Sequence, residues 1–209
     1  MRAAIILFNI NKIDKDCLKD ALIIGVDKGA LNAINHNIQL DIAIGDFDSV
    51  SKSELDLIKN NSKRIIKLNP IKDETDTLEA INLCKDYDEI TIYGGIKGKR
   101  IEHFYANLIL LRNHKNIKMI DDNSLIEIKN KSFIPNLNYK FISLFSLNDN
   151  TNISLTGFKY NLSNYDLKSN DPLCISNEII SNPYIDINNG ELLIIYSKDD
   201  GGLQWTDLF

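Results

Sequence analysis

The chain has 209 residues, 44% of them hydrophobic, so it is long enough to bury one large core or two smaller ones, and a disordered chain is not expected. Its 24 Lys and Arg against 29 Asp and Glu give a net charge of -5, which argues against a broad basic surface for nucleic acid. Small molecules are the expected partners, including a phosphorylated one in a local cationic pocket.

The cysteines and the apolar runs indicate the compartment. Cys17, Cys84 and Cys174 are far apart and lack CxxC spacing, so they indicate neither a disulfide framework nor a zinc site. No apolar run approaches the roughly 18 residues of a membrane span, and the run at residues 3–8 is too short for the core of a signal peptide. We therefore expect a soluble, cytoplasmic protein that does not contact a membrane.

In the first half of the chain, short β-type runs alternate with helical patterns. The expected strands are Ala3–Phe8, Leu22–Val26, Asp41–Ile44, Arg64–Leu68, Glu89–Tyr93 and Ile117–Ile120. Ser51 with Glu54 three residues later indicates a capping box, and residues 73–87 and 100–114 have helical patterns of their own. This alternation predicts an α/β domain with a mostly parallel sheet covered by helices in Rossmann-like layers.

The second half has a different pattern. After about Asp122 the segments are β-rich and punctuated by Asn, Gly, Ser and Pro, which predicts an all-β unit. The turn at residues 188–190, Asn-Asn-Gly between two apolar runs, is its clearest hairpin signal. We therefore predict two domains, residues 1–122 and 123–209.

Polar residues follow the predicted strands at the edge where open parallel sheets bind ligands. Asp46 and Asp48 follow the third strand. In an extended segment both carboxylates would point the same way and could share a hard cation such as Mg²⁺. Asp73 and Asp76 are three residues apart at a predicted helix start, so they would lie on one face and could supply further ligands or orient metal-bound water. The sequence thus indicates a carboxylate-rich edge.

Cations and glycines occur at the same edge. Lys72, Lys97, Lys99 and Arg100 lie in or beside loops with Gly94, Gly95 and Gly98, a composition that suits phosphate contacts. A metal site, cations and glycines together indicate phosphoryl chemistry on a nucleotide. Each feature also has a structural alternative: a capped turn, a helix cap, solvated lysines, or a helix-surface His103. Their joint placement at one sheet edge favours the functional interpretation.

In these motifs the chain resembles the thiamine pyrophosphokinase (thiamine diphosphokinase) family. The matching stretches are VDKGA, IGDFDSV, KDETDTLEA and YGGIKGKRIEHFYANLILL, followed by GFKYNL, SNEI and GELLIIYS. The resemblance implies an α/β ATP-binding catalytic domain, a C-terminal β-sandwich that binds thiamine, and a homodimer. It further implies transfer of a pyrophosphoryl group from ATP to the hydroxyethyl oxygen of thiamine, with AMP as the other product.

The resemblance also implies the site residues. The implied catalytic residues are Asp46, Asp48, Asp73 and Asp76, with Mg²⁺ held by Asp46, Asp48 and Asp76. The implied ATP contacts are Asp27, Lys72, Thr75, Arg100, His103 and Asn107. The implied thiamine contacts, at the dimer interface, are Tyr160, Ser176 and Asn177. The chain departs from the usual family motifs at Lys28, Lys99 and Glu102, and its tail with Trp205 and Phe209 runs past the usual family end.

Two other functions stay open at this point. A pterin pyrophosphokinase would use the same donor with a 6-hydroxymethyl pterin as acceptor. A non-catalytic protein would bind thiamine or a nucleotide without turnover, although the full set of aspartates argues against it.

Overall fold

The computed structural model describes residues 1–8, 10–71, 73–98 and 100–198. The chain divides into two compact units, Met1–Asp122 and Asn123–Phe209. Four positions singled out in the sequence, Lys72, Lys99, Trp205 and Phe209, lie outside the described residues.

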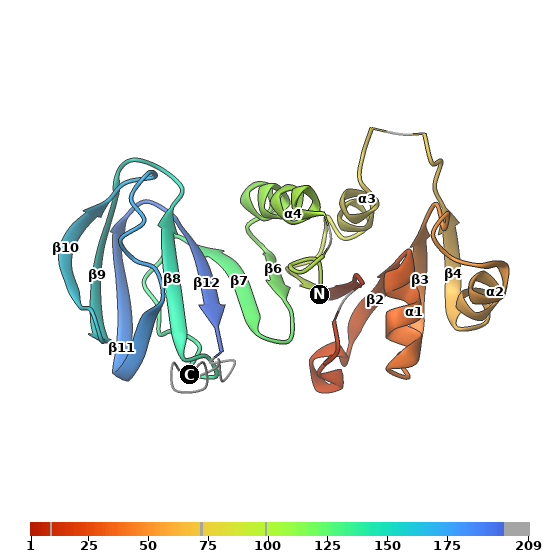
Figure 1. Cartoon of the computed structure of the whole chain (residues 1–209), viewed down its shortest axis with the longest axis horizontal. Helices are drawn as coiled ribbons and strands as arrows, with labels where there is room; N and C mark the ends of the chain where they lie inside the picture. The colour runs from red at the N-terminus through yellow and green to blue at the C-terminus, as the bar shows by residue number, and fades with distance from the viewer. Residues whose placement is uncertain (9, 72, 99, 199–209) are drawn as a thin grey trace, which may run out of the picture. The chain divides into compact units, whose positions relative to one another are not determined.

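The described part of the first unit contains a six-stranded parallel sheet. Its strands are β1 (Arg2–Ile6), β2 (Ala21–Val26), β3 (Leu40–Gly45), β4 (Ser62–Lys67), β5 (Glu89–Tyr93) and β6 (Ile117–Ile120). They lie in the order β4-β3-β2-β1-β5-β6, and each neighbouring pair is parallel (Figure 1). The predicted parallel sheet is confirmed: β5 and β6 have the predicted bounds, and the ends of the other four strands differ from the predicted ones by at most two residues.

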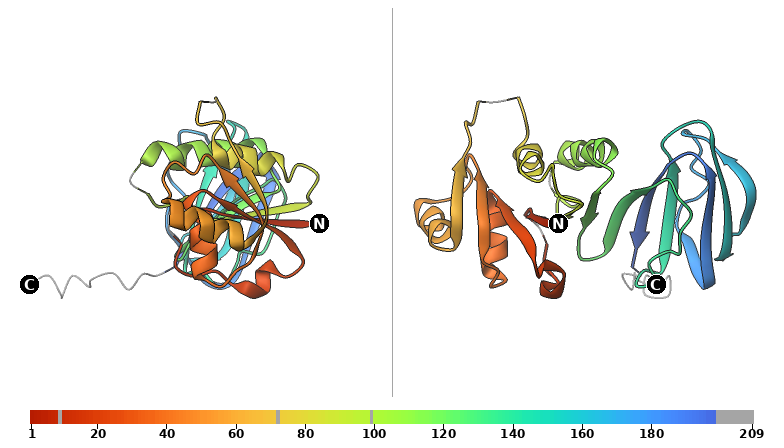
Figure 2. Two further views of the ribbon diagram at one scale, coloured as in Figure 1. Left: turned by 90° about the vertical axis from the view of Figure 1, so that its right-hand side faces the viewer. Right: turned by 180° about the vertical axis from the view of Figure 1, so that it is seen from behind.

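The helices of this unit cover both faces of the sheet. They are the 3-10 helix η1 (Lys15–Leu18) and the α-helices α1 (Lys28–Asn35), α2 (Lys52–Asn60), α3 (Asp76–Asn82) and α4 (Ile101–Asn113). The chain moves from β2 to β4 in one direction, and from β4 back to β5 and on to β6 in the other. Right-handed crossovers therefore put α1 and α2 on one face and α3 and α4 on the other (Figures 1 and 2). Within the described ranges, no helix is long and apolar enough to cross a bilayer.

Side-chain caps decide where two of these helices begin. At α2 the predicted capping box is confirmed: Ser51 accepts from the Glu54 amide, and the Glu54 carboxylate accepts from the Ser51 amide at 2.7 Å. At α3 the hydroxyl of Thr75 accepts from the Leu78 amide at 3.2 Å, so the helix begins at Asp76. The prediction that Asp73 and Asp76 share a helix face is therefore wrong, because the Thr75 cap leaves Asp73 outside the helix.

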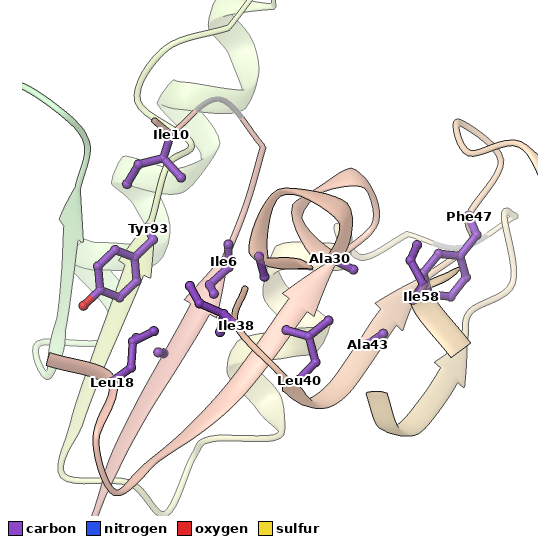
Figure 3. Packing of buried hydrophobic residues seen from close by; sticks show 12 residues of the cluster. Ile6, Ile10, Leu18, Ala30, Ile38, Leu40, Ala43, Phe47, Ile58 and Tyr93 are labelled. Carbon is purple, nitrogen blue, oxygen red and sulfur yellow. The ribbon is translucent and has the colours of Figure 1, made fainter. Parts of the chain in front are cut away.

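An apolar cluster fills the space between the sheet and helices α1 and α2 (Figure 3). Phe47, the central residue of GDFDS, belongs to this cluster with 6% of its surface exposed and lies near Ile58 of α2. Its φ of 59° lies in the left-handed region, which an apolar residue adopts only when its surroundings enforce it. The extended segment predicted for Asp46 to Asp48 is therefore wrong: burial of Phe47 turns the chain between the two aspartates.

The described part of the second unit contains strands and no helix, as predicted. Its strands are β7 (Ser124–Lys129), β8 (Phe141–Ser146), β9 (Thr151–Phe158), β10 (Leu162–Leu167), β11 (Asn177–Asn189) and β12 (Leu192–Ser197). They pair antiparallel in the order β7-β12-β8-β11-β9-β10 (Figure 1). Strands β8, β9 and β12 alternate buried and partly exposed residues along most of their length, so each directs one face into an apolar core.

Strand β11 changes partner along its length. Its first residues pair with β8, whereas from Ile179 onward it pairs with β9. Strand β12 pairs with β7 and β8 instead. Among the pairs formed by the described residues, β11 and β12 are not partners, so the predicted hairpin at residues 188–190 is wrong. The turn is present, with Gly190 at φ 93°, but the two strands that it joins do not pair with each other.

Candidate active site

Three carboxylates meet at the carboxyl edge of the parallel sheet. One oxygen each of Asp27, Asp46 and Asp76 lies within 4.8 Å of the others. Asp27 follows β2, Asp46 follows the neighbouring strand β3, and Asp76 is the first residue of α3, which packs on both strands. All three residues are partly buried. The sheet order thus brings together residues that are 19 and 30 positions apart in the chain.

The backbone of Asp27 directs its carboxylate into this cluster. Asp27 occupies the N-cap position of α1 at φ 47°, but its side chain makes no capping hydrogen bond. Instead its Oδ1 accepts from the amide of Phe47 at 3.3 Å. A non-glycine residue in this conformation is held there by its surroundings, a strain that proteins tend to place at functional sites. Asp27 therefore serves the cluster instead of capping its own helix.

Burial, together with crowding of the carboxylates, changes the protonation of Asp27. Burial, followed by a hydrogen bond to Asp76 and the charges of Asp76 and Asp46, raises the pKa of Asp27 to about 7, and the bond from the Phe47 amide opposes the rise only in part. Close like charges on oxygen ligands are stabilised by a hard divalent cation. The three residues therefore fit a magnesium ion, by their oxygen donors and by the charge that they share.

Asp48 and Asp73 lie outside this cluster. Asp48 is exposed, and its backbone amide donates to Oδ1 of Asp46 at 3.0 Å, a turn that orients the Asp46 carboxylate. Asp73 is exposed and precedes the Thr75 cap. Of the metal ligands that the family resemblance implied, the structure brings together Asp46 and Asp76 and adds Asp27.

The site residues predicted on and just before α4 divide into exposed and buried ones. Arg100 and His103 are exposed, with Arg100 Nε 3.8 Å from a Glu102 carboxylate oxygen. Asn107 is buried, and its amide donates to the carbonyl of Gly95 at 3.1 Å. Gly95 is at φ 75° in the loop after β5, a conformation that suits glycine. Asn107 therefore holds the shape of the glycine loop, while Arg100 and His103 are open to solvent.

The second unit contains an apolar pocket of about 300 Å³. Its lining residues are Tyr160, Leu162, Leu173, Cys174, Ile175 and Asn177. Two of the three predicted thiamine contacts, Tyr160 and Asn177, belong to this lining. Ser176 lies between two lining residues, is exposed, and has a left-handed backbone with φ 52°.

Sequence reasoning missed two parts of these sites. It assigned Asp27 to ATP and not to the carboxylate cluster, although the adjacency of β2 and β3 could have suggested the cluster. It also missed the apolar walls of the pocket, Leu162, Leu173 and Ile175, for which the sequence offers no signal beyond ordinary hydrophobic residues.

A carboxylate cluster at the carboxyl edge of a parallel sheet, joined in one chain to a unit of antiparallel strands with an apolar pocket, defines an α/β protein whose polar cluster lies where open parallel sheets bind ligands. Comparison with known families identifies it further. Residues 15–120 match the family described as thiamin pyrophosphokinase, catalytic domain, and residues 126–194 match the family described as thiamin pyrophosphokinase, vitamin B1 binding domain. The chain belongs to the thiamine pyrophosphokinase family.

Individual relatives agree with this assignment. The thiamine pyrophosphokinase of Bacillus subtilis (strain 168) is 34% identical over 191 residues, which cover 84% of this chain and 87% of the relative. The crystal structure of the Bacillus subtilis enzyme has a TM-score of 0.80 at 29% identity, covering 95% of this chain and 100% of the other. A thiamin pyrophosphokinase family protein from Enterococcus faecalis has a TM-score of 0.81 at 26% identity, covering 95% and 99%.

Proposed function

We infer that the chain is an enzyme with thiamine pyrophosphokinase activity, which converts ATP and thiamine into AMP and thiamine diphosphate. One observation carries this conclusion: each family match lies within one of the two units, and that unit contains a site suited to the matched domain's function. The catalytic-domain match lies within the unit that holds the carboxylate cluster, and the vitamin B1 match lies within the unit that holds the apolar pocket.

In the proposed reaction, the hydroxyl oxygen of thiamine bonds to the β-phosphorus of ATP while the bond from that phosphorus to the oxygen of the departing AMP breaks. Mg²⁺ held by Asp27, Asp46 and Asp76 would offset charge on the transferring group. Asp46 or Asp48 accepts the proton of the attacking hydroxyl. The protein's main contribution is positioning and electrostatic stabilisation, because little covalent chemistry is needed from its side chains.

We assign the phosphate and nucleotide contacts to residues around the same edge. Arg100 and His103 are exposed at the first turn of α4 and supply donors for the triphosphate. Lys72 and Thr75 belong to the same proposed set. Asp48 and Asp73 are exposed, and in this proposal their carboxylates orient water or a second cation.

The pocket of the second unit is the proposed thiamine site. Tyr160 is 64% exposed there, so its ring is free to stack on a flat ligand. An aromatic face attracts a cation such as the thiazolium ring of thiamine. Leu173 and Ile175 provide apolar contact for the rest of the ligand.

Three further features are proposed. The chain forms a homodimer whose interface includes this pocket, because Tyr160, Leu173 and Ile175 expose apolar surface around it. The second unit folds as a β-sandwich, in agreement with the change of partner along β11. The three free thiols are compatible with a reducing cytoplasm as the site of action.

The test uses the purified full chain with magnesium, ATP and thiamine, and follows the nucleotides and thiamine diphosphate by chromatography. Equal amounts of AMP and thiamine diphosphate are expected. Formation of ADP would overturn the pyrophosphoryl transfer. AMP release with a 6-hydroxymethyl pterin and none with thiamine would establish the other acceptor, and ligand binding without any AMP would establish a non-catalytic protein.

A further inference from the structure

The side chain of Asn177 is bonded in both directions to the main chain of Tyr160. The Tyr160 amide donates to Oδ1 of Asn177 at 3.0 Å, and Nδ2 of Asn177 donates to the Tyr160 carbonyl at 2.7 Å. Asn177 is buried, with 5% of its surface exposed. A carboxamide used in this way pairs with a residue as a neighbouring strand would.

The position of this pair explains why a side chain is needed. The ladder between β9 and β11 ends where the Lys159 amide donates to the Glu178 carbonyl at 2.9 Å. The next residue, Tyr160, would have to pair with the backbone of Asn177. That backbone lies opposite Ile142 in the pairing of β11 with β8. The Asn177 amide therefore extends the β9–β11 ladder by one residue where its own main chain serves another strand.

The residue before Asn177 is also fixed. Ser176 has a left-handed backbone at φ 52°, and its amide donates to Oγ of Ser143 in β8 at 3.0 Å. Asn177 thus starts from an anchored position on the β8 side and reaches the turn between β9 and β10, where Tyr160 lies. The two hydrogen bonds tie that turn to the sheet.

The ring of Tyr160 has much less support of its own. Tyr160 lines the pocket with 64% of its surface exposed, and a charged contact, Lys159 Nζ at 5.8 Å from the ring centroid, comes from the same turn. The Tyr160 backbone therefore mainly sets the position of the ring. The Asn177 side chain fixes that backbone by bonding both its amide and its carbonyl.

We propose that Asn177 is a positioning residue for thiamine binding: it fixes the backbone of Tyr160, and so the place of the stacking ring, instead of binding thiamine itself. This inference rests on the proposed function, since it takes the pocket as the thiamine site. It changes the role that the family resemblance gave to Asn177 from a ligand contact to a support for the neighbouring aromatic residue.

A double-mutant cycle tests this role. Asn177→Leu keeps the branched shape of the side chain at a somewhat larger volume and removes both hydrogen bonds, and Tyr160→Ala removes the ring. The dissociation constant of thiamine is measured by calorimetry on the full chain with magnesium and a non-hydrolysable ATP analogue, and kcat and KM are measured with ATP. Asn177→Leu should raise the thiamine dissociation constant and KM about tenfold, with the KM for ATP and kcat changed less than about twofold.

Thiamine binding by the double variant decides between the two roles. On the Tyr160→Ala background, Asn177→Leu should weaken thiamine binding less than about twofold further, because the ring that it positions is gone. If Asn177→Leu raises the thiamine dissociation constant about tenfold both with and without the Tyr160 ring, Asn177 contacts thiamine directly and the proposal is overturned. If Asn177→Leu does not fold, Asn177→Ser also removes both bonds and enters the same cycle.

Asn189→Ser is the matched control. The Asn189 side chain also donates to a main-chain carbonyl, that of Asn150 at 2.9 Å, at the far end of β11. Thiamine binding should be unchanged in this variant, and a weakening equal to that of Asn177→Leu would contradict a local role. A wild-type chain that forms no thiamine diphosphate would overturn the proposed function and this inference together. If the wild-type chain is active, but Asn177→Leu weakens thiamine binding equally with and without the Tyr160 ring, only the inference is overturned.

Discussion

Gly45 and Asp27 lie so close together that a side chain at position 45 would overlap the Asp27 carboxylate: an ideal Cβ on Gly45 would be 1.8 Å from Oδ1 of Asp27. Gly45 is the last residue of β3, and Asp27 follows the neighbouring strand β2. The missing side chain of Gly45 is what lets the Asp27 carboxylate approach Asp46 and Asp76. The glycine of GDFDS therefore shapes the cluster as well as ending the strand.

Gly45→Ala should consequently damage the site. The added methyl group has to displace the Asp27 carboxylate, and a shift of about 1 Å in a catalytic group can cost about 100-fold in rate. We expect kcat/KM to fall about 100-fold and the magnesium concentration for half-maximal activity to rise. Steady-state assays across a magnesium titration measure both, with circular dichroism as a check on folding. A folded variant with unchanged magnesium dependence would exclude the Asp27 carboxylate from the metal site.

The roles of Asp46 and Asp48 can be separated by metal binding. Asp46 belongs to the carboxylate cluster, whereas Asp48 is exposed outside it. Asp46→Asn should therefore weaken binding of Mn²⁺, used as a spectroscopic probe for magnesium, by about tenfold or more, because an amide replaces a charged oxygen ligand. Asp48→Asn should abolish turnover and leave Mn²⁺ binding close to that of the wild type. Electron paramagnetic resonance measures the free metal.

Asp56→Asn serves as the control for that pair. Asp56 is exposed on α2 and pairs with Lys59 at 3.2 Å, a surface ion pair of the kind that contributes about 0–1 kcal/mol. Both activity and metal binding should be unchanged. If Asp48→Asn weakens Mn²⁺ binding as much as Asp46→Asn does, Asp48 is a ligand and the cluster of three carboxylates is incomplete.

The fold of the first unit was predictable because its signals are local. Isoleucine-rich runs with loops between them gave the strands, and Ser51 with Glu54 gave the start of α2. The start of α3 was not predictable in the same way, since Asp73 and Thr75 are both good N-cap residues. Thr75 is the N-cap in a structure where α3 packs on β2 and β3. That packing depends on the arrangement of the whole sheet, which the local sequence does not show.

The site was predictable in its composition and less so in its geometry. Alternation of side chains along a strand suggested that Asp46 and Asp48 point together, but burial of Phe47 overrides that pattern. Asp27 belongs to the carboxylate cluster because β2 and β3 are neighbours in the sheet, and no short sequence motif predicts that pairing. The link between Asn177 and Tyr160 spans 17 residues and depends on strand pairing, so only the structure shows it.

The raised pKa of Asp27 predicts a pH dependence of stability without metal. A carboxyl group with a pKa of about 7 in the folded protein and an ordinary value near 3.8 in the unfolded chain binds more protons when folded. Its stabilising effect is fully present below about pH 4 and is lost as the pH rises toward and through 7. The loss should be about 1 to 2 kcal/mol once solvent screening of this partly exposed group is allowed for.

Chemical denaturation in a chelator at several pH values measures this effect. Asp27→Asn should remove most of the decline, because an amide does not titrate. Magnesium should also remove it, since the cation stabilises the ionised cluster. A wild-type slope that persists in Asp27→Asn would assign the titration to another group.

Loss of the Thr75 cap should affect the site as well as the helix. The Thr75 hydroxyl fixes the first turn of α3, and Asp76 is the first residue of that turn. Thr75→Ala should cost about 1 kcal/mol of stability and let Asp76 move, so metal affinity should fall several-fold and kcat/KM about tenfold. Ser51→Ala removes the equivalent cap of α2, a helix that carries no member of the carboxylate cluster. The same loss of stability is expected there with activity retained. Equal losses of activity in the two variants would show that general destabilisation, and not the position of Asp76, is responsible.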